Sequence, residues 1–189
     1  MFPDMDADPK LTQEQLKALT DARERAKGIF AAARVAAFNG WSLAVFAVLT
    51  ILFGLTSPIL LALGIGLGML ARNELRGRDA LRALDPEAPT RLVRNQMGLM
   101  ALAVAYCSWS LYRTRFRPER TWEELETLAG LNPGYIQGLT SAGYAVAILA
   151  TVLLVGLNAR YYHRRKAMLA AYLDETPDWV VTLLKVTER

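Results

Sequence analysis

The sequence has one cysteine and one histidine among its 189 residues. A single cysteine excludes a disulfide within the chain and any metal cluster built from several cysteines. A catalytic zinc site normally uses three protein ligands, and no acidic cluster lies near His163 in the sequence. Serine-nucleophile motifs of the Gly-x-Ser-x-Gly type and phosphate-binding glycine loops are also absent. The sequence therefore predicts no catalytic residue, no metal site and no cofactor.

Charge is missing from three long stretches. No Asp, Glu, Lys or Arg occurs in residues 35–71, 95–112 or 127–159. A hydrocarbon core of ~30 Å takes roughly 20 helical residues, whereas a soluble helix carries charge along its outer face. Hydrophobic residues make up 53% of the chain, and its mean hydropathy is +0.18. These stretches predict an all-α integral membrane protein.

Four transmembrane helices fit the three stretches. The first stretch is interrupted by Ser57-Pro58, and as one helix it would reach ~55 Å at 1.5 Å per residue. We therefore expect a tight helical hairpin that turns at residues 55–58. The predicted spans cover residues 36–54, 58–72, 96–112 and 140–158, and together they form a membrane domain over 36–159.

Amphipathic cytoplasmic helices are expected at both ends. Residues 1–35 combine an acidic tail with a helix that begins at a capping box, Thr12 with Gln15. This helix suits the membrane surface, a partner, or packing on the chain itself. Residues 160–189 hold a second helical segment, in which Thr176-Pro177 begins a last helix. Its apolar stripe is expected to bind a partner and consists of Trp179, Val180, Leu183 and Leu184.

Orientation follows from the positive residues, which favour the cytoplasmic side. Residues 1–35, 72–95 and 160–189 hold six Lys and Arg each, whereas residues 113–120 hold four. Four spans place the first three groups together, 18 against four. Both termini are therefore predicted in the cytoplasm, for a multi-pass protein of the cell (inner) membrane. The net charge of +4 indicates phospholipid headgroups rather than nucleic acid, because the cations flank apolar stretches.

Residues typical of the membrane interface mark the ends of the spans. Aromatic side chains prefer the headgroup level, and basic side chains bind anionic headgroups. The residues predicted there are Trp41, Trp109, Tyr161, Tyr162, Arg164, Arg165 and Lys166.

Small residues spaced four apart predict close helix packing. Removal of side chains lets two helix backbones approach, which is how small residues favour association in lipid. The residues predicted at helix or oligomer contacts are Gly64, Gly66, Gly68, Ala101, Ala105, Gly143 and Ala147. The sequence leaves open whether these faces meet within one chain or between chains.

Ionisable side chains are confined to the edges of the predicted spans. Transport proteins place such groups at membrane depth, where they are costly, so their absence argues against a proton-coupled carrier. Glu74 follows span 2 and is expected to form an ion pair with Arg78 or Arg94 at the membrane edge.

The sequence favours a non-enzymatic accessory or scaffold subunit that binds other membrane proteins. The alternative is a small homo-oligomeric channel or pore, and a lipid-modifying enzyme is a third hypothesis. The expected partners are membrane lipids and either other membrane subunits or further copies of the chain.

Overall fold

The computed structural model describes residues 12–116 and 120–187, and the predicted acidic tail lies outside them. No strand occurs among the described residues, so the all-α prediction is confirmed. The helices are α1 (Gln13–Phe53), α2 (Pro58–Arg82), α3 (Ala88–Phe116), α4 (Arg120–Leu128), α5 (Tyr135–Glu175) and α6 (Asp178–Thr187).

Local sequence signals set several helix ends. The Thr12 hydroxyl accepts a hydrogen bond from the Gln15 backbone, and the Gln15 side chain accepts one from the Thr12 backbone. This confirms the predicted capping box. The predicted hairpin is also confirmed, because only residues 54–57 separate the end of α1 from Pro58, where α2 begins with Ser57 as its N-cap. Proline suits the first helical turn, where its missing N–H costs no hydrogen bond.

The longest helices continue well beyond the predicted spans. α1 and α5 have 41 residues each, so each is ~60 Å long, about twice the hydrocarbon thickness. α1 runs without a break through Asn39-Gly40, and α2 continues to Arg82, beyond the predicted end of span 2 near residue 72. The charged residues mark an expected membrane boundary without ending the helices.

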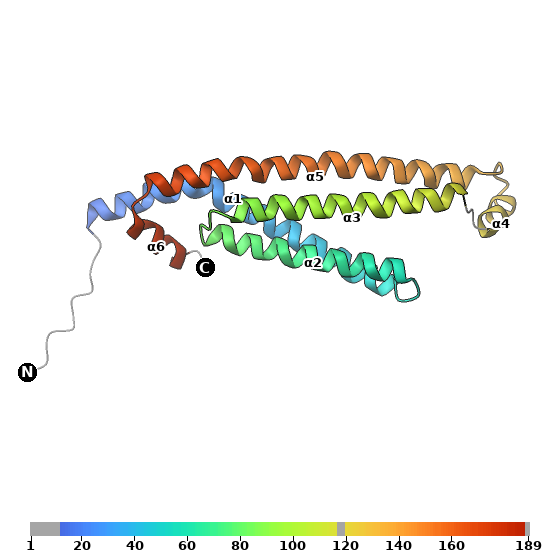
Figure 1. Cartoon of the computed structure of the whole chain (residues 1–189), viewed down its shortest axis with the longest axis horizontal. Helices are drawn as coiled ribbons and strands as arrows, with labels where there is room; N and C mark the ends of the chain where they lie inside the picture. Colours follow the sequence, from blue (N-terminus) through green and yellow to red (C-terminus); the bar gives the residue numbers. More distant parts are fainter. Residues whose placement is uncertain (1–11, 117–119, 188–189) are drawn as a thin grey trace, which may run out of the picture.

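The chain folds back on itself as two antiparallel helix pairs (Figure 1). α1 packs along α2, and α3 packs along α5. The start of α1, the end of α5 and α6 gather at one end of the bundle, which we call the charged end. α4 and the α1–α2 turn lie toward the opposite, apolar end. An Arg25–Glu175 contact of 3.5 Å joins the two long helices at the charged end.

The hydrophobic core lies at the charged end. α1 contributes small buried residues that let neighbouring helices approach closely, and α2, α3, α5 and α6 contribute larger ones. Its fully or nearly fully buried members include Ala22, Ala26, Ile29, Ala33, Leu81, Leu92, Tyr162, Leu169, Val180 and Leu184. Among the three settings that the sequence allowed for the first amphipathic helix, the structure shows packing on the chain itself.

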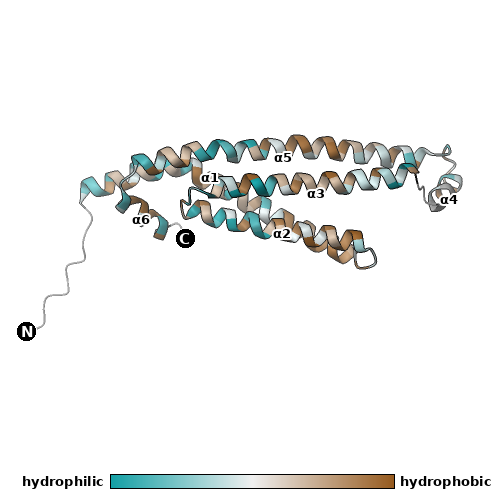
Figure 2. Cartoon of the chain, in the orientation of Figure 1, coloured by the Kyte–Doolittle hydropathy of each residue, from teal (hydrophilic) through white to brown (hydrophobic). Residues whose placement is uncertain are grey.

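The apolar end buries few of its hydrophobic side chains. Val45, Leu52, Val146 and Leu154 are all more than half exposed. In Figure 2 hydrophobic residues colour α1 and α2 toward their turn and the middle of α3 and α5, whereas α4 and the nearby ends of α3 and α5 are paler or hydrophilic. Large apolar surfaces rarely face water in a soluble protein. This pattern is that of helices that face lipid or other helices.

Three described helices are long and apolar enough to cross a membrane: α1, α2 and α5. α3 is not among them, because Asn95, Gln96 and the hydroxyl and aromatic residues near its end lower its hydropathy. These three helices are consistent with a helical membrane protein, and the fourth span over 96–112 stays a prediction.

Candidate functional site

A buried carboxylate joins all four long helices. Glu74 of α2 is 0% exposed. Its Oε2 accepts a hydrogen bond from Asn95 Nδ2 at 2.6 Å, and its Oε1 accepts from Gln96 Nε2 at 3.0 Å and from the Tyr162 hydroxyl at 2.8 Å. The Tyr162 oxygen in turn accepts from Asn39 Nδ2 at 3.3 Å. We call these five residues the Glu74 cluster.

The hydrogen bonds in the Glu74 cluster replace the water that burial removes. A buried carboxylate is tolerated only when its oxygens find donors or an opposite charge. Here the three direct donors are neutral, and no Lys or Arg among the described residues lies within ion-pair distance of Glu74. Each of these hydrogen bonds would leave a buried polar atom without a partner if its helix moved away. The cluster therefore fixes how α2, α3 and α5 sit against one another, with α1 attached through Asn39.

The predicted ion pair of Glu74 with Arg78 or Arg94 is wrong. Arg78 instead contacts the neighbouring Asp79, with Nη2 2.7 Å from Oδ1. Glu74 points into the bundle, where amides and a phenol replace the guanidinium. The prediction for Tyr162 at the membrane interface is also corrected, because this side chain is 0% exposed and belongs to the core.

An arginine-lined cavity of about 420 Å³ lies beside the Glu74 cluster, between α2 and α3. We call it the arginine pocket. Asn95 belongs to both: its Nδ2 also donates to the Leu70 carbonyl at 3.1 Å. The other lining residues are Asn73, Arg76, Gly77, Arg91 and Arg94. Gly77 lets Leu92 pack closely here, because a Cβ at position 77 would overlap its side chain.

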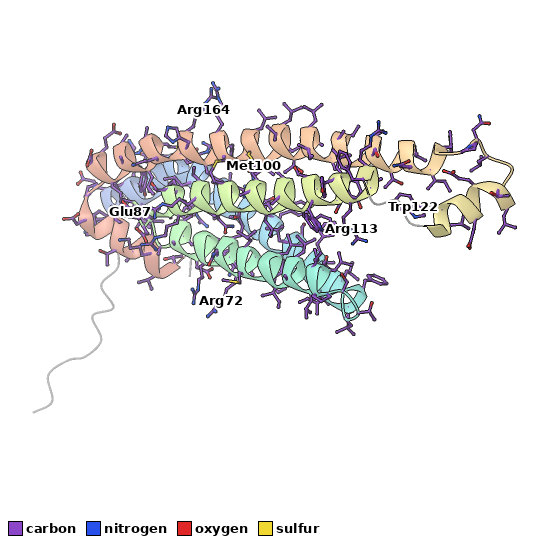
Figure 3. The ribbon with its side chains drawn as sticks, turned by 45° about the vertical axis from the view of Figure 1, so that its right-hand side comes forward. Arg72, Glu87, Met100, Arg113, Trp122 and Arg164 are labelled. Atoms are coloured by element: carbon purple, nitrogen blue, oxygen red, sulfur yellow. The ribbon has the colours of Figure 1, made fainter. Side chains whose placement is uncertain are left out.

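A smaller cavity of about 170 Å³ lies toward the apolar end. It sits between the α1–α2 turn and the α3–α5 pair and is lined mainly by aromatic and hydroxyl-bearing side chains. Figure 3 shows two of its lining residues, Arg113 of α3 and Trp122 of α4. The others include Ser57, Tyr106, Trp109, Ser110 and Tyr144.

The predicted packing glycines occupy different settings. A Cβ on Gly64 would lie 2.6 Å from Ile51 Cγ1 and 3.2 Å from the Ala47 carbonyl oxygen, so α1 and α2 approach closely there. A Cβ on Gly66 would lie 3.0 Å from Leu102 of α3, and one on Gly68 would have ordinary contact at 3.9 Å.

The predicted packing residues of α3 and α5 are largely open. Ala101 and Ala105 are exposed, and Ala147 is partly buried. A Cβ on Gly143 would meet nothing within 4 Å. The faces of α1 and α2 therefore meet within the chain, whereas Ala101, Ala105 and Gly143 lie on surfaces that no described helix covers.

The predicted interfacial residues other than Tyr162 lie at the surface. Trp41 is 62% exposed and Trp109 47% exposed. Arg165 stacks over the Tyr161 ring at 4.7 Å. Arg164 and Lys166 are exposed, and Figure 3 shows Arg164 projecting away from α5.

The predicted partner-binding stripe of α6 is divided by the fold. Val180 and Leu184 are 0% and 1% exposed and pack in the chain's own core, which corrects their assignment to a partner. Trp179 and Leu183 are 40% and 39% exposed. A helix of about ten residues is marginal alone in water. α6 is therefore stabilised by docking on the core through Val180 and Leu184.

Among the described residues, no group of three or more His, Cys, Asp and Glu side chains could hold a metal ion. Sequence reasoning missed the Glu74 cluster, although the adjacent amides Asn95 and Gln96 at the start of an apolar stretch were a signal. The sequence matches no protein-family model, and no curated protein or solved structure resembles it significantly.

Proposed function

We propose that this chain is a non-enzymatic accessory or scaffold subunit of the cell (inner) membrane that binds other membrane proteins. The observation that carries the proposal is the exposure of the α3–α5 pair, and of α5 above all. None of the most apolar 18-residue stretch of α5 is buried by the rest of the chain. This stretch offers a long surface to lipid or to helices of another protein.

Small residues on the open faces support helix binding rather than lipid contact alone. Ala101 and Ala105 of α3 and Gly143 of α5 are exposed within the single chain. In lipid, where the hydrophobic effect between helices is lost, association depends on close backbone packing at such residues. These residues are where we expect a partner helix.

The topology that we propose has four spans with both termini in the cytoplasm. α2 ends at the charged end, whereas α5 begins near α4 at the apolar end (Figure 1). If α1, α2 and α5 cross the membrane, α3 has to carry the chain across as well, because it runs beside α5 between these two ends. The 18 Lys and Arg of residues 1–35, 72–95 and 160–189, against four in residues 113–120, support the cytoplasmic assignment.

The charged end supplies a second surface for a partner. Trp179 and Leu183 keep exposed side chains on a helix that is fixed to the core through Val180 and Leu184. A rigidly held, partly exposed tryptophan is a typical interface anchor. An accessory subunit could thus contact its partner both within the membrane and on the cytoplasmic side.

The test is purification of the full chain from its native membranes in mild detergent, with measurement of the particle's mass and subunit composition. We expect a stoichiometric foreign membrane protein. The double variant Ala101→Leu/Ala105→Leu should lose it, whereas Met97→Leu, an exposed change on the same helix, should retain it. A closed ring made of this chain alone would contradict the proposal and favour the pore.

A further inference from the structure

Three arginines line the arginine pocket, against two carboxylates: Asp85, which pairs with Arg91, and the buried Glu74, which accepts a hydrogen bond from Asn95 of the lining. Arg91 contacts Asp85, with Nη1 3.2 Å from Oδ2. Arg76 and Arg94 line the same cavity from α2 and α3, and neither forms an ion pair with a described residue. Gathered cations repel one another, so an anion in the cavity would relieve an unfavourable arrangement.

The lining suits a phosphate. Planar guanidinium groups bind phosphate oxygens through paired hydrogen bonds, and the Asn73 amide at the rim can donate another. A volume of about 420 Å³ lies within the range of sites that hold small molecules or headgroups.

The Asn95 side-chain oxygen is an acceptor that lacks a hydrogen-bond donor. The residue is 6% exposed, and its Oδ1 is buried with no hydrogen-bond partner among the described residues. An unsatisfied buried acceptor is costly. A small rotation of the Asn95 side chain would bring this oxygen to the pocket, where a ligand that carries hydroxyl groups beside its phosphate can donate to it.

The position of the pocket relates it to the membrane. It reaches from Leu70, within predicted span 2, to Arg76, beyond the end of that span, and faces Arg91 and Arg94 just before predicted span 3. In Figure 2 this is where the helices change from hydrophobic to hydrophilic. Basic pockets between spans on the cytoplasmic side are suited to anionic lipid headgroups.

We propose that the arginine pocket binds the headgroup of an anionic phospholipid whose alcohol carries hydroxyl groups, as phosphatidylglycerol does. Arg76 and Arg94 hold the phosphodiester, and the acyl chains extend toward the apolar end. The proposal rests on the membrane orientation proposed above. It adds a specific lipid site to a surface that already carries diffuse positive charge.

The experiment titrates dioctanoyl phosphatidylglycerol into the full chain in neutral detergent and follows the unfolding temperature. Binding to the folded state raises this temperature in proportion to occupancy. We expect a saturable rise with this lipid and none with dioctanoyl phosphatidylcholine. The variant Arg76→Gln/Arg94→Gln should need about 30-fold more lipid for the same rise, on the scale of two cations near an anionic headgroup.

The matched control is Arg164→Gln/Lys166→Gln, which removes two exposed cations on α5 and should leave the titration unchanged. An equal loss in this control would show diffuse attraction and overturn the proposal, as would an equal rise with phosphatidylcholine. A rise with glycerol 3-phosphate as large as with the lipid would assign the pocket to a soluble phosphate ester instead. The comparison of lipids needs no variant, and it uses the isolated chain, so its failure leaves partner binding in native membranes untouched.

Discussion

The Tyr162 hydroxyl donates a 2.8 Å hydrogen bond to Glu74 Oε1, which joins α5 to α2 across 88 positions of sequence. Both side chains are fully buried. The same phenol oxygen accepts from Asn39 of α1. The Tyr162 side chain thus connects the α1–α2 pair to the α3–α5 pair. Toward the apolar end the two pairs diverge from each other (Figure 1).

Tyr162→Phe should therefore destabilise the protein. The change removes the donor to a buried carboxylate and leaves its oxygen short of a hydrogen bond, at a cost of ~1–3 kcal/mol. Thermal unfolding in detergent measures the effect. The control is Tyr161→Phe, which keeps the ring that stacks with Arg165 and should leave stability nearly unchanged. Equal unfolding temperatures for both variants would contradict the role assigned to Tyr162.

Glu74→Gln tests the carboxylate itself. A glutamine keeps the size of the side chain but replaces one acceptor by an NH₂ group, which then faces the donors Asn95, Gln96 or Tyr162. We expect a loss of ~2 kcal/mol or more, because the new NH₂ group opposes one of these donors and leaves it without an acceptor. Glu87→Gln, at an exposed position near the α2–α3 turn, should have little effect.

Charge-free stretches predicted the helical hairpin and the all-α fold, because apolar length and turn residues are local properties of the chain. They did not predict where the helices end. Helix formation continues through charged residues, so α2 reaches Arg82 although its expected membrane part stops near residue 72.

The Glu74 cluster could not be derived from spacing. Its donors come from 21, 22 and 88 positions away, and only the packing of α2 against α3 and α5 brings them together. Glu74 has Arg78 four residues later, which is the ordinary pattern of a surface ion pair. The local pattern therefore indicated the wrong partner. The actual partners are the amides and the phenol that helix packing buries together with Glu74.

Gly64→Leu should disrupt the α1–α2 hairpin. A Cβ at this position would lie 2.6 Å from Ile51, so any side chain forces the helices apart, at a cost of about 1–3 kcal/mol. Gly143→Leu is the matched control, since its Cβ would meet no atom within 4 Å. In the isolated chain, only Gly64→Leu should lower the unfolding temperature. A similar fall for Gly143→Leu would show that the α5 face is packed within the chain.

Two adjacent leucines of α6 differ in burial. Leu184 is 1% exposed and Leu183 is 39% exposed. Leu184→Ala should cost ~2–5 kcal/mol through the cavity it leaves in the core. Leu183→Ala should change stability little and should weaken retention of a partner instead. Limited proteolysis of α6 and thermal unfolding distinguish these effects, and equal behaviour of the two variants would contradict the docking of α6.

The most direct test of the account asks which side of the membrane each end of the bundle faces. Cys107 is the sole cysteine, so a Cys107→Ser background allows single cysteines to be placed by Glu24→Cys, Glu87→Cys, Leu128→Cys and Asp174→Cys, all at exposed positions. In sealed, right-side-out vesicles, an impermeant maleimide should label the cysteine at position 128 and reach the other three only after the membrane is opened. Labelling of position 128 on the same side as position 87 would mean that α3 does not cross, and would contradict the four-span account.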